Sequence, residues 1–284
     1  MAQNLNKNSI NSLKEKISNR LDKVEGNYAV VYFNLDDESD HLFINEQEEF
    51  HAASTMKTPV MIEVFKQANE GRFNLDDSVI VKNEFKSIVD SSLFSMDIGE
   101  DSGEGLYKFI GKKKTIRDLV FEMITVSSNL ATNILIDLVD AKNVMKTMKE
   151  IGAKNIKVLR GVEDIKAFDL GMNNTTTAYD LMLVFKAIAN NQIVSKEVCE
   201  EMIDILLHQK FNERIPAGLP EEAKVAHKTG SITGVGHDSG IIFLPNGKKY
   251  ILILLSKNVN EENEMTKAQA EVSKIIYDYV ISQK

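Results

Sequence analysis

The stretch DSGIIFLPNGKKYILILLSKN, residues 238–258, carries the pattern on which the fold depends. Two runs rich in β-branched and large apolar residues flank a short polar turn, which is typical of a β-hairpin. The Asn246-Gly247 pair in that turn favours type I′ geometry. The segment AKVAHKTG, residues 223–230, lies just upstream and has the composition of another strand. The C-terminal part of the chain therefore predicts consecutive antiparallel strands.

The N-terminal region contains strands that could complete this sheet. The segments NYAVVYFNL (27–35) and DHLFIN (40–45) have strand composition and are joined by an acidic turn. Residues 9–24 and 264–283 instead carry apolar side chains at helical spacing. If the strands of the two ends pair, the result is a five-stranded antiparallel sheet flanked by N- and C-terminal helices.

The middle of the chain has the period of helices rather than strands. The expected helices cover residues 54–71, 115–126, 129–139, 141–152, 175–191 and 195–209. We therefore predict an α/β fold of the α+β kind, with an all-helical lobe inserted into the sheet lobe. The expected division is 1–50 plus 215–284 for the discontinuous α/β lobe and 51–214 for the helical lobe, with the active site in the cleft between them.

Composition and charge exclude several classes of function. The 284-residue chain has a net charge of -8, which argues against a nucleic-acid partner. Its single cysteine, Cys199, rules out an internal disulfide framework. No run approaches the ~20 apolar residues of a membrane span. The histidines lack metal-ligand spacing and no glycine-rich phosphate loop occurs, so we expect neither a metal nor a cofactor.

Ser54 and Lys57 stand three residues apart where the first central helix begins, in AASTMKTPVMIEVF (52–65). One interpretation is structural: the serine caps the helix and the lysine lies at the surface. The other is catalytic, since a hydroxyl becomes a nucleophile when a neighbouring amine with a lowered pKa takes its proton. This pair alone favours the structural interpretation.

Two downstream motifs change that balance. Ser127-Ser128-Asn129 lies between two apolar helices, where the structural alternative is a helix break with a cap. Lys228-Thr229-Gly230 ends a candidate strand, where glycine lets the backbone approach a ligand closely. S-x-x-K, S-D-N and K-T-G form the set of class A β-lactamases and penicillin-binding proteins, and the three motifs occur here in that order and in those settings, with Ser128 at the middle position of the second. The sequence resembles a class A serine β-lactamase over nearly the whole chain.

The resemblance implies a role for each motif residue. Ser54 would be the acylated nucleophile and Lys57 its proton partner, while Ser127 would pass a proton to the leaving lactam nitrogen with help from Lys228. Asn129 would hold the substrate's side-chain amide and Thr229 its carboxylate. The backbone N–H groups of Ser54 and Ser231, the latter just after Gly230, would form the oxyanion hole.

The residue that activates the deacylating water is less well marked. The family uses a glutamate in a loop with the pattern R-x-E-x-x-L-N, and the matching loop here is LRGVEDIKAFDLGMNNTTTA (159–178). Two residues rather than one separate Arg160 from Glu163, and Asn174 replaces the usual Asp. Glu163 is the expected base, Asp164 is the alternative, and both acids could instead be solvated loop residues.

Two further departures bear on substrate turnover. Ser128 stands where the family usually has Asp, and SITGVGHD (231–238) lacks the Arg with which many members bind the substrate carboxylate. His237 is the nearest cationic candidate in that segment, although a lone histidine there is more often structural. Together the departures predict weak or unusual β-lactam turnover.

The resemblance yields three hypotheses about function. The leading one is a serine β-lactamase that works through a Ser54 acyl-enzyme, assisted by Lys57 and Glu163. The second is a related serine hydrolase, a D-Ala-D-Ala peptidase or an esterase with slow β-lactam deacylation, and the third is a non-catalytic binding protein. We expect a monomer with a small-molecule β-lactam substrate. We also expect a periplasmic or secreted location, with an export signal that is not part of this sequence.

Overall fold

The computed structural model describes residues 2–283, and the side chains of residues 10–283. Its main sheet has five antiparallel strands in the order β2-β1-β11-β10-β9, which confirms the predicted fold class. The strands are β1 (Asn27–Asn34), β2 (His41–Ile44), β9 (Lys224–Ile232), β10 (Val235–Phe243) and β11 (Lys249–Lys257). The N- and C-terminal strands meet where β1 pairs with β11, so both ends of the chain are needed to build the sheet.

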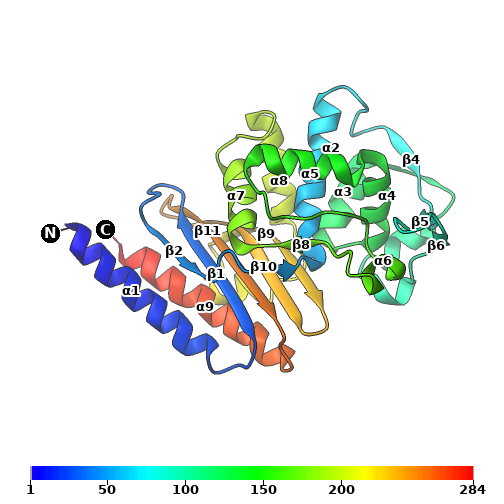
Figure 1. Ribbon diagram of the computed structural model, residues 1–284. Helices are drawn as coiled ribbons and strands as arrows, with labels where there is room; N and C mark the ends of the chain where they lie inside the picture. Colours follow the sequence, from blue (N-terminus) through cyan, green and yellow to red (C-terminus); the bar gives the residue numbers. More distant parts are fainter. Residues whose placement is uncertain (1, 284) are drawn as a thin grey trace.

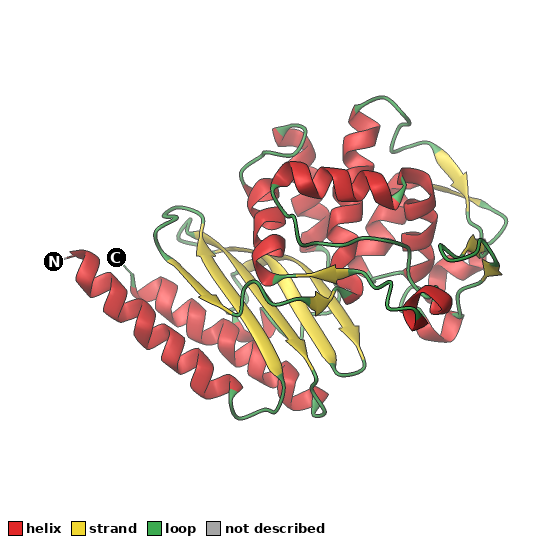
Figure 2. Cartoon of the chain, in the orientation of Figure 1, coloured by secondary structure: helices red, strands yellow, loops and turns green. Residues whose placement is uncertain are grey.

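One face of the sheet is covered by the two terminal helices, α1 (Ala2–Leu21) and α9 (Glu262–Ser282), which lie side by side in Figures 1 and 2. The stripe predicted from the N-terminal sequence is buried here, including Leu13, Ile17 and Leu21. These side chains pack with the sheet and α9 in one hydrophobic cluster. Burial of the stripe thus explains why an amphipathic helix forms at this end.

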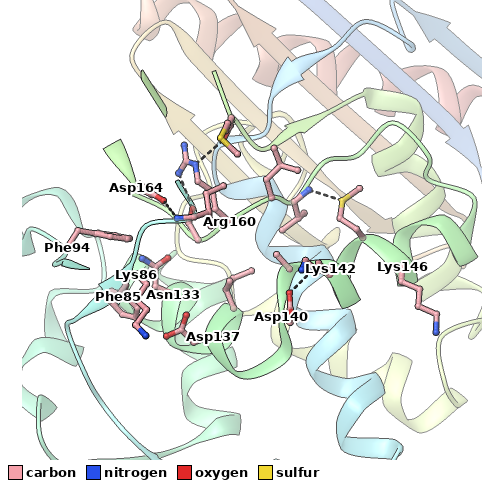
Figure 3. A pocket seen from close by; sticks show the side chains of 18 of the residues that line it. Phe85, Lys86, Phe94, Asn133, Asp137, Asp140, Lys142, Lys146, Arg160 and Asp164 are labelled. Carbon is pink, nitrogen blue, oxygen red and sulfur yellow. Dashed lines mark hydrogen bonds between the residues drawn. The ribbon is translucent and has the colours of Figure 1, made fainter. Parts of the chain in front are cut away.

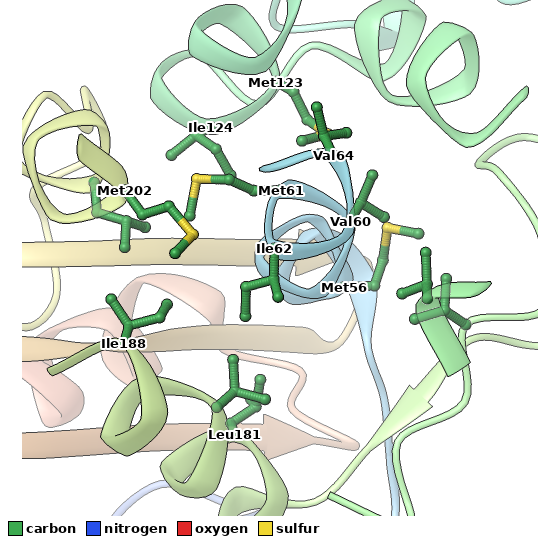
Figure 4. Packing of buried hydrophobic residues seen from close by; sticks show 14 of the residues in the cluster. Met56, Val60, Met61, Ile62, Val64, Met123, Ile124, Leu181, Ile188 and Met202 are labelled. Carbon is green, nitrogen blue, oxygen red and sulfur yellow. The ribbon is translucent and has the colours of Figure 1, made fainter. Parts of the chain in front are cut away.

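The opposite face carries the helices of the central region, as Figure 1 shows. They are α2 (Lys57–Asn69), α3 (Ile116–Thr125), α4 (Asn129–Val139), α5 (Ala141–Ile151), α6 (Ile165–Asp169), α7 (Ala178–Ala189) and α8 (Lys196–Leu207). Figure 4 shows α2 in the middle of this lobe, with Met61 and Ile62 among side chains of α3, α7 and α8. A helix surrounded in this way is apolar on most of its circumference, which fits the run VMIEVF.

Shorter elements complete the lobe. Three two-stranded ribbons pair β3 (Phe50–His51) with β8 (Thr175–Thr176), β4 (Ser78–Ile80) with β7 (Lys113–Thr115), and β5 (Phe85–Lys86) with β6 (Leu93–Phe94). The 3₁₀ turns are η1 (Ala53–Met56), η2 (Ile98–Glu100), η3 (Glu104–Phe109) and η4 (Pro216–Gly218). Strands of two or three residues are too short to show a period in the sequence. The lobe boundaries at residues 50 and 215 stay a prediction.

The β10–β11 turn differs from the expected type I′ geometry. Such a turn needs positive φ at both central residues, but Gly247 has a φ of 86° whereas Asn246 is not in the positive region. The N–H of Gly247 donates to the carbonyl of Leu244 at 3.0 Å, which makes Pro245 the second residue of the turn. The fixed φ of proline suits that position in a type I turn, and Gly247 then forms the bulge that closes the hairpin.

Candidate active site

Ser54 lies in η1, directly before α2, and it does not cap either helix. Neither η1 nor α2 has a side-chain cap hydrogen bond. Residues three apart in a 3₁₀ turn are eclipsed, so Ser54 and Lys57 project from the same side of the chain. Ala53, just before the serine, has a φ of 44°, a strained conformation for a non-glycine residue. The capping interpretation of Ser54 therefore has no support in the structure.

The Lys57 amine is completely buried against Ser127 and the start of α4. Its Nζ donates to the carbonyl oxygen of Ser127 at 2.7 Å, to Oδ1 of Asn129 at 2.8 Å and to Oγ of Ser127 at 3.2 Å. Burial lowers the pKa of Lys57 to about 7, although the negative charges of Asp101 and Glu163 oppose that shift. Near neutral pH a substantial fraction of this amine is therefore unprotonated and able to accept a proton.

Ser127 connects the two lysines of the site. Its Oγ accepts hydrogen bonds from Nζ of Lys57 and, at 3.0 Å, from Nζ of Lys228. A hydroxyl has two acceptor lone pairs and one donor proton, so two amine donors leave its proton available for another group. Ser127 has a φ of 57°, and the neighbouring Ser128 caps α4 by accepting from the N–H of Ala131. Capping thus falls to Ser128, while Ser127 and Asn129 face the lysines.

The Lys228-Thr229-Gly230 segment lies on β9, the edge strand of the sheet, against η1. Lys228 is fully buried, and burial together with the nearby charge of Lys57 holds its pKa well below the usual value. A Cβ on Gly230 would lie 3.0 Å from the backbone nitrogen of Ser54, so glycine allows the close approach of strand and turn. The backbone of β9 thus passes directly beside the Ser54 N–H.

Glu163 comes to the same place from the loop between α5 and α6. One carboxylate oxygen accepts from Nδ2 of Asn129 at 2.9 Å, and the other accepts from the backbone N–H of Asp97 at 3.2 Å. Burial raises the pKa of this half-buried carboxyl above its ordinary value. The backbone of Glu163 has a φ of 60°, so Glu163 is the third strained residue of the site, with Ala53 and Ser127. Strain of this kind concentrates at functional sites.

The carboxylate of Asp164 accepts hydrogen bonds from a different set of groups than that of Glu163. The Asp164 carboxylate accepts from Oγ of Ser87 and the N–H of Ile88, both at 2.9 Å, and it caps α6 through the N–H of Ala167. Asp164 lines the cavity of about 240 Å³ that Ser54 also lines, and it lines a second, larger cavity of about 980 Å³ with Phe94 and Asn133 (Figure 3). Of the two acids that the sequence leaves open, the geometry favours Glu163 as the one that serves the serine.

A smaller cavity brings the candidate residues together. About 240 Å³ of space is lined by Ser54, Asn129, Glu163 and Ser231, with other side chains of η1, β9 and the 160–174 loop around them. No group of three or more His, Cys, Asp or Glu among the described residues could hold a metal ion. The chemistry that these groups can perform is proton transfer and nucleophilic attack.

Three residues of the site were not identified from the sequence. Asn133 lies one turn after Asn129 on α4 and binds the loop through the N–H of Val162 at 2.7 Å and its carbonyl at 2.9 Å. Arg214 donates to Oγ of Ser231 at 2.9 Å, while its Nε is buried without a partner in the described part of the chain. Asp101 binds the start of α4. Only Asn133 had a sequence signal, a second asparagine at helical spacing on an apolar helix.

His237 does not provide the cation that the sequence lacks after Gly230. The side chain is fully buried, and burial lowers its pKa to about 4. Nε2 lies 2.8 Å from the carbonyl oxygen of His51, and Nδ1 lies 3.3 Å from the backbone nitrogen of Ser256. His237 is therefore a neutral residue that joins β3, the short strand before η1, to the main sheet. The guanidinium of Arg214 is the cation that lies beside Ser231.

A serine at a helix start, a buried lysine after it and a second lysine on the sheet edge form an arrangement that could activate a serine nucleophile. The chain belongs to the β-lactamase enzyme family, whose sequence model matches residues 12–280. It is therefore a hydrolase of the β-lactamase type.

Individual relatives are distant in sequence but similar over the full length. β-Lactamase VEB-1 of Pseudomonas aeruginosa is 24% identical, with 96% of this chain and 91% of that protein covered. The extended-spectrum β-lactamase PER-1 of the same organism is 23% identical over 95% of this chain and 88% of its own length. Among solved structures, PBP-A superposes with a TM-score of 0.81 at 26% identity, covering 95% of this chain and 96% of PBP-A. The extended-spectrum β-lactamase TLA-3 shares the fold, with a TM-score of 0.83 at 23% identity and coverage of 96% and 99%.

Proposed function

We propose that the protein is a serine β-lactamase of class A type that opens the β-lactam amide through an acyl-enzyme on Ser54. The observation that carries the proposal is the Lys57 amine, which is fully buried, has a pKa of about 7 and lies one 3₁₀ turn after Ser54. An amine kept neutral beside a serine is the activation that this nucleophile requires. Family membership supports the same reaction.

The acylation step follows from which groups of the site can accept a proton and which can donate one. The neutral amine of Lys57 takes the proton of the Ser54 hydroxyl as Oγ bonds to the lactam carbonyl carbon. The C–N bond of the tetrahedral intermediate then breaks, and Ser127 gives its proton to the leaving nitrogen. The Lys57 ammonium formed in the first step, which is hydrogen-bonded to Oγ of Ser127, then returns that proton to it, while Nζ of Lys228 keeps its own hydrogen bond to the same oxygen. The proton relay through Ser127 thus follows the hydrogen bonds that its Oγ makes with the two lysines.

Substrate binding uses the groups around the 240 Å³ cavity. The N–H groups of Ser54 and Ser231 would hold the developing oxyanion, which fits the close passage of β9 beside η1. Asn129 would hold the substrate's side-chain amide. Thr229, Ser231 and the guanidinium of Arg214 would bind the substrate carboxylate, because a partly buried Arg presents donors suited to that group.

Deacylation is assigned to Glu163. Its pKa is raised by burial, which suits a carboxylate that must accept a proton from water near neutral pH. The bond from Asn129 fixes one oxygen of the carboxylate beside the cavity that Ser54 lines. Glu163 would take a proton from a water as the water oxygen attacks the ester carbonyl of the acyl-enzyme. The bond from that carbonyl carbon to Oγ of Ser54 then breaks, the opened lactam leaves as a carboxylic acid, and Glu163 gives its proton to Oγ of Ser54.

The second candidate is a penicillin-binding enzyme that acylates but releases product slowly. It is supported by the likeness to PBP-A, one variant of which is described as an acyl-enzyme complex with penicillin G. The unusual spacing between Arg160 and Glu163 favours it as well. Long-lived penicillin adducts on the unmodified protein, or cleavage of D-Ala-D-Ala peptides or esters, would identify it. A protein that only binds would form no adduct at Ser54.

Location and assembly follow from the substrate and remain proposals. β-Lactams and peptidoglycan are met outside the inner membrane, so the proposed function requires a periplasmic or secreted protein. No helix in the described part of the chain is long and apolar enough to cross a membrane. We also infer a monomer, because one chain contributes every residue used in this mechanism.

The test is nitrocefin hydrolysis by the parent protein and by Ser54→Ala and Glu163→Gln. The proposal expects turnover by the parent and none by Ser54→Ala. Glu163→Gln should give a single turnover that stops at a stable acyl-enzyme. Equal turnover by all three proteins would refute the mechanism. Ser12→Ala, at an exposed position of α1, is the matched serine-to-alanine control and should hydrolyse nitrocefin like the parent.

A further inference from the structure

Asp101 is a buried carboxylate that binds the start of α4 from a separate segment. It is only 3% exposed, and it follows η2 in the loop before α3. One oxygen accepts from the N–H of Asn129 at 2.9 Å, and the other accepts from the N–H of Leu130 at 2.8 Å. The first turn of a helix has unpaired N–H groups and a partial positive charge, so a carboxylate is well placed there.

The same carboxylate fixes its own loop against the Ser127-Ser128-Asn129 motif. It accepts from the N–H of Gly103 at 2.8 Å and from the hydroxyl of Tyr107 at 3.2 Å. Oγ of Ser128 lies 3.4 Å from the Asp101 carboxylate, and a Cβ on Gly103 would lie 2.4 Å from Cβ of Ser128. The loop therefore occupies the space directly beside Ser128, where a longer side chain would meet it.

The bonds of Asp101 continue to the reacting groups. Asn129, whose N–H it binds, accepts from Nζ of Lys57 and donates to Glu163. The backbone N–H of Asp97, in the same loop, binds the second oxygen of Glu163. The Asp101 carboxylate thus orders the start of α4, where Asn129 binds the proposed acylation base, Lys57. It also orders the loop whose Asp97 binds the proposed deacylation base, Glu163.

We propose that Asp101 is a positioning residue of the acyl-transfer site, which supplies from the η2–η3 loop the carboxylate that the motif lacks at Ser128. This inference rests on the proposed function, since it concerns the residues that acylate and deacylate. In this chain the acid lies in the η2–η3 loop, as Asp101, and the motif carries the small capping residue Ser128 in its place.

The charge of Asp101 also acts on the groups around it. Lys57 is faced by Asp101, by Glu163 from the loop and by Lys228 from β9. Asp101 itself is faced by Lys57 from α2, by Tyr107 from η3, by Glu122 from α3 and by Glu163. Its negative charge raises the pKa of Lys57 and that of Glu163. Loss of this charge should therefore lower both pKa values, which a purely structural role would not do.

The experiment compares the parent with Asp101→Asn, the double variant Asp101→Ser with Ser128→Asp, and the control Asp22→Asn, at an exposed position just after α1. Acylation by a fluorescent penicillin and deacylation are measured separately from about pH 5 to 9, with thermal unfolding beside them. Asp101→Asn should lower both rate constants at neutral pH by about tenfold, because a charged hydrogen-bond acceptor is lost. The acidic limb of each pH profile should move down by about half a pH unit.

The double variant returns a carboxylate to the start of α4, now from the motif itself, and Asp101→Ser removes the side chain that the new aspartate would otherwise meet. An aspartate at the N-cap can bind the first N–H groups of α4. It should recover most of the rate lost in Asp101→Asn, and the acidic limbs should return toward those of the parent. Asp22→Asn should match the parent throughout. Parent-like rates and unmoved limbs in Asp101→Asn would overturn the proposal, and so would a rate loss without any movement of the limbs.

A failure of the proposed function would be seen separately. If the parent formed no penicillin adduct, the acyl-transfer mechanism would fall. Amide hydrogen exchange would then decide the positioning role by itself. Faster exchange of the Asn129 and Leu130 amides in Asp101→Asn would support it, and unchanged exchange would overturn it.

Discussion

Replacing Lys57 by methionine should make the protein more stable and inactive. The side chain is fully buried, and its pKa falls from 10.5 to about 7 on folding. Each pKa unit corresponds to about 1.4 kcal/mol, so keeping this lysine costs about 4–5 kcal/mol of folding free energy at neutral pH. Methionine has nearly the same length and no charge, and it removes that cost.

The gain is reduced by the hydrogen bonds that are lost. The carbonyl of Ser127 and Oδ1 of Asn129 each lose the Lys57 donor, at about 1 kcal/mol apiece. We therefore expect Lys57→Met to raise the free energy of unfolding by about 2–3 kcal/mol near pH 7. Nitrocefin hydrolysis should fall by about 10³-fold or more, because the proton acceptor is gone.

The pH dependence has a definite sign. Below pH 7 the lysine is protonated in both states, so the full cost of burying the charge is present. As the pH rises from about 7 toward 10.5, the unfolded lysine also loses its proton and the cost disappears. The stability advantage of Lys57→Met should therefore be largest in mild acid and shrink steadily in base.

Urea unfolding of the parent and Lys57→Met at about pH 6, 7.5 and 9.5 measures this difference. Lys16→Met, at an exposed position of α1, is the matched control and should show no pH-dependent gain. The reasoning would be refuted by an advantage of Lys57→Met that stays constant over this range. It would also be refuted by a variant that hydrolyses nitrocefin like the parent.

Three further predictions test the surroundings of the site. Gly103→Ala should lower the free energy of unfolding by about 2 kcal/mol, because its Cβ would lie 2.4 Å from that of Ser128. Gly105→Ala meets no atom within 4 Å and is the control, so equal urea midpoints for the two variants would argue against the packing described. Asn133→Ala should slow deacylation about tenfold and leave acylation near the parent rate, because the loop loses both of its hydrogen bonds at Val162. Stopped-flow measurement separates the two steps, and equal effects on both would contradict this prediction. Arg214→Ala should raise KM about tenfold for β-lactams with a free carboxylate and much less for their methyl esters, whereas equal changes for both would exclude the role given to Arg214.

The sequence predicted the elements of the fold well because their periods are long and regular. The sheet strands and the central helices lie within a few residues of their expected bounds, and Gly152 ends α5 with a φ of 97° as its position indicated. The β10–β11 turn was predicted wrongly because Pro245 outweighs the Asn246-Gly247 pair in setting the turn type. The short ribbons left no periodic signal at all.

The site was predictable only where a motif marked it. Ser54, Ser127 and Lys228 belong to segments whose order identifies them, and the structure brings all three to one place. Asp101 and Arg214 lie in segments without a pattern, and they reach the site through folding of distant parts of the chain. Contacts of that kind depend on tertiary packing, which a single sequence does not display.

The most direct test of the central claim is the intact mass of the protein after exposure to penicillin. The account predicts that the parent shows a transient increase equal to the mass of penicillin, which peptide mapping places on Ser54. It predicts a lasting increase in Glu163→Gln and none in Ser54→Ala. An adduct on any other residue, or no adduct in Glu163→Gln while the parent hydrolyses the drug, would contradict the account.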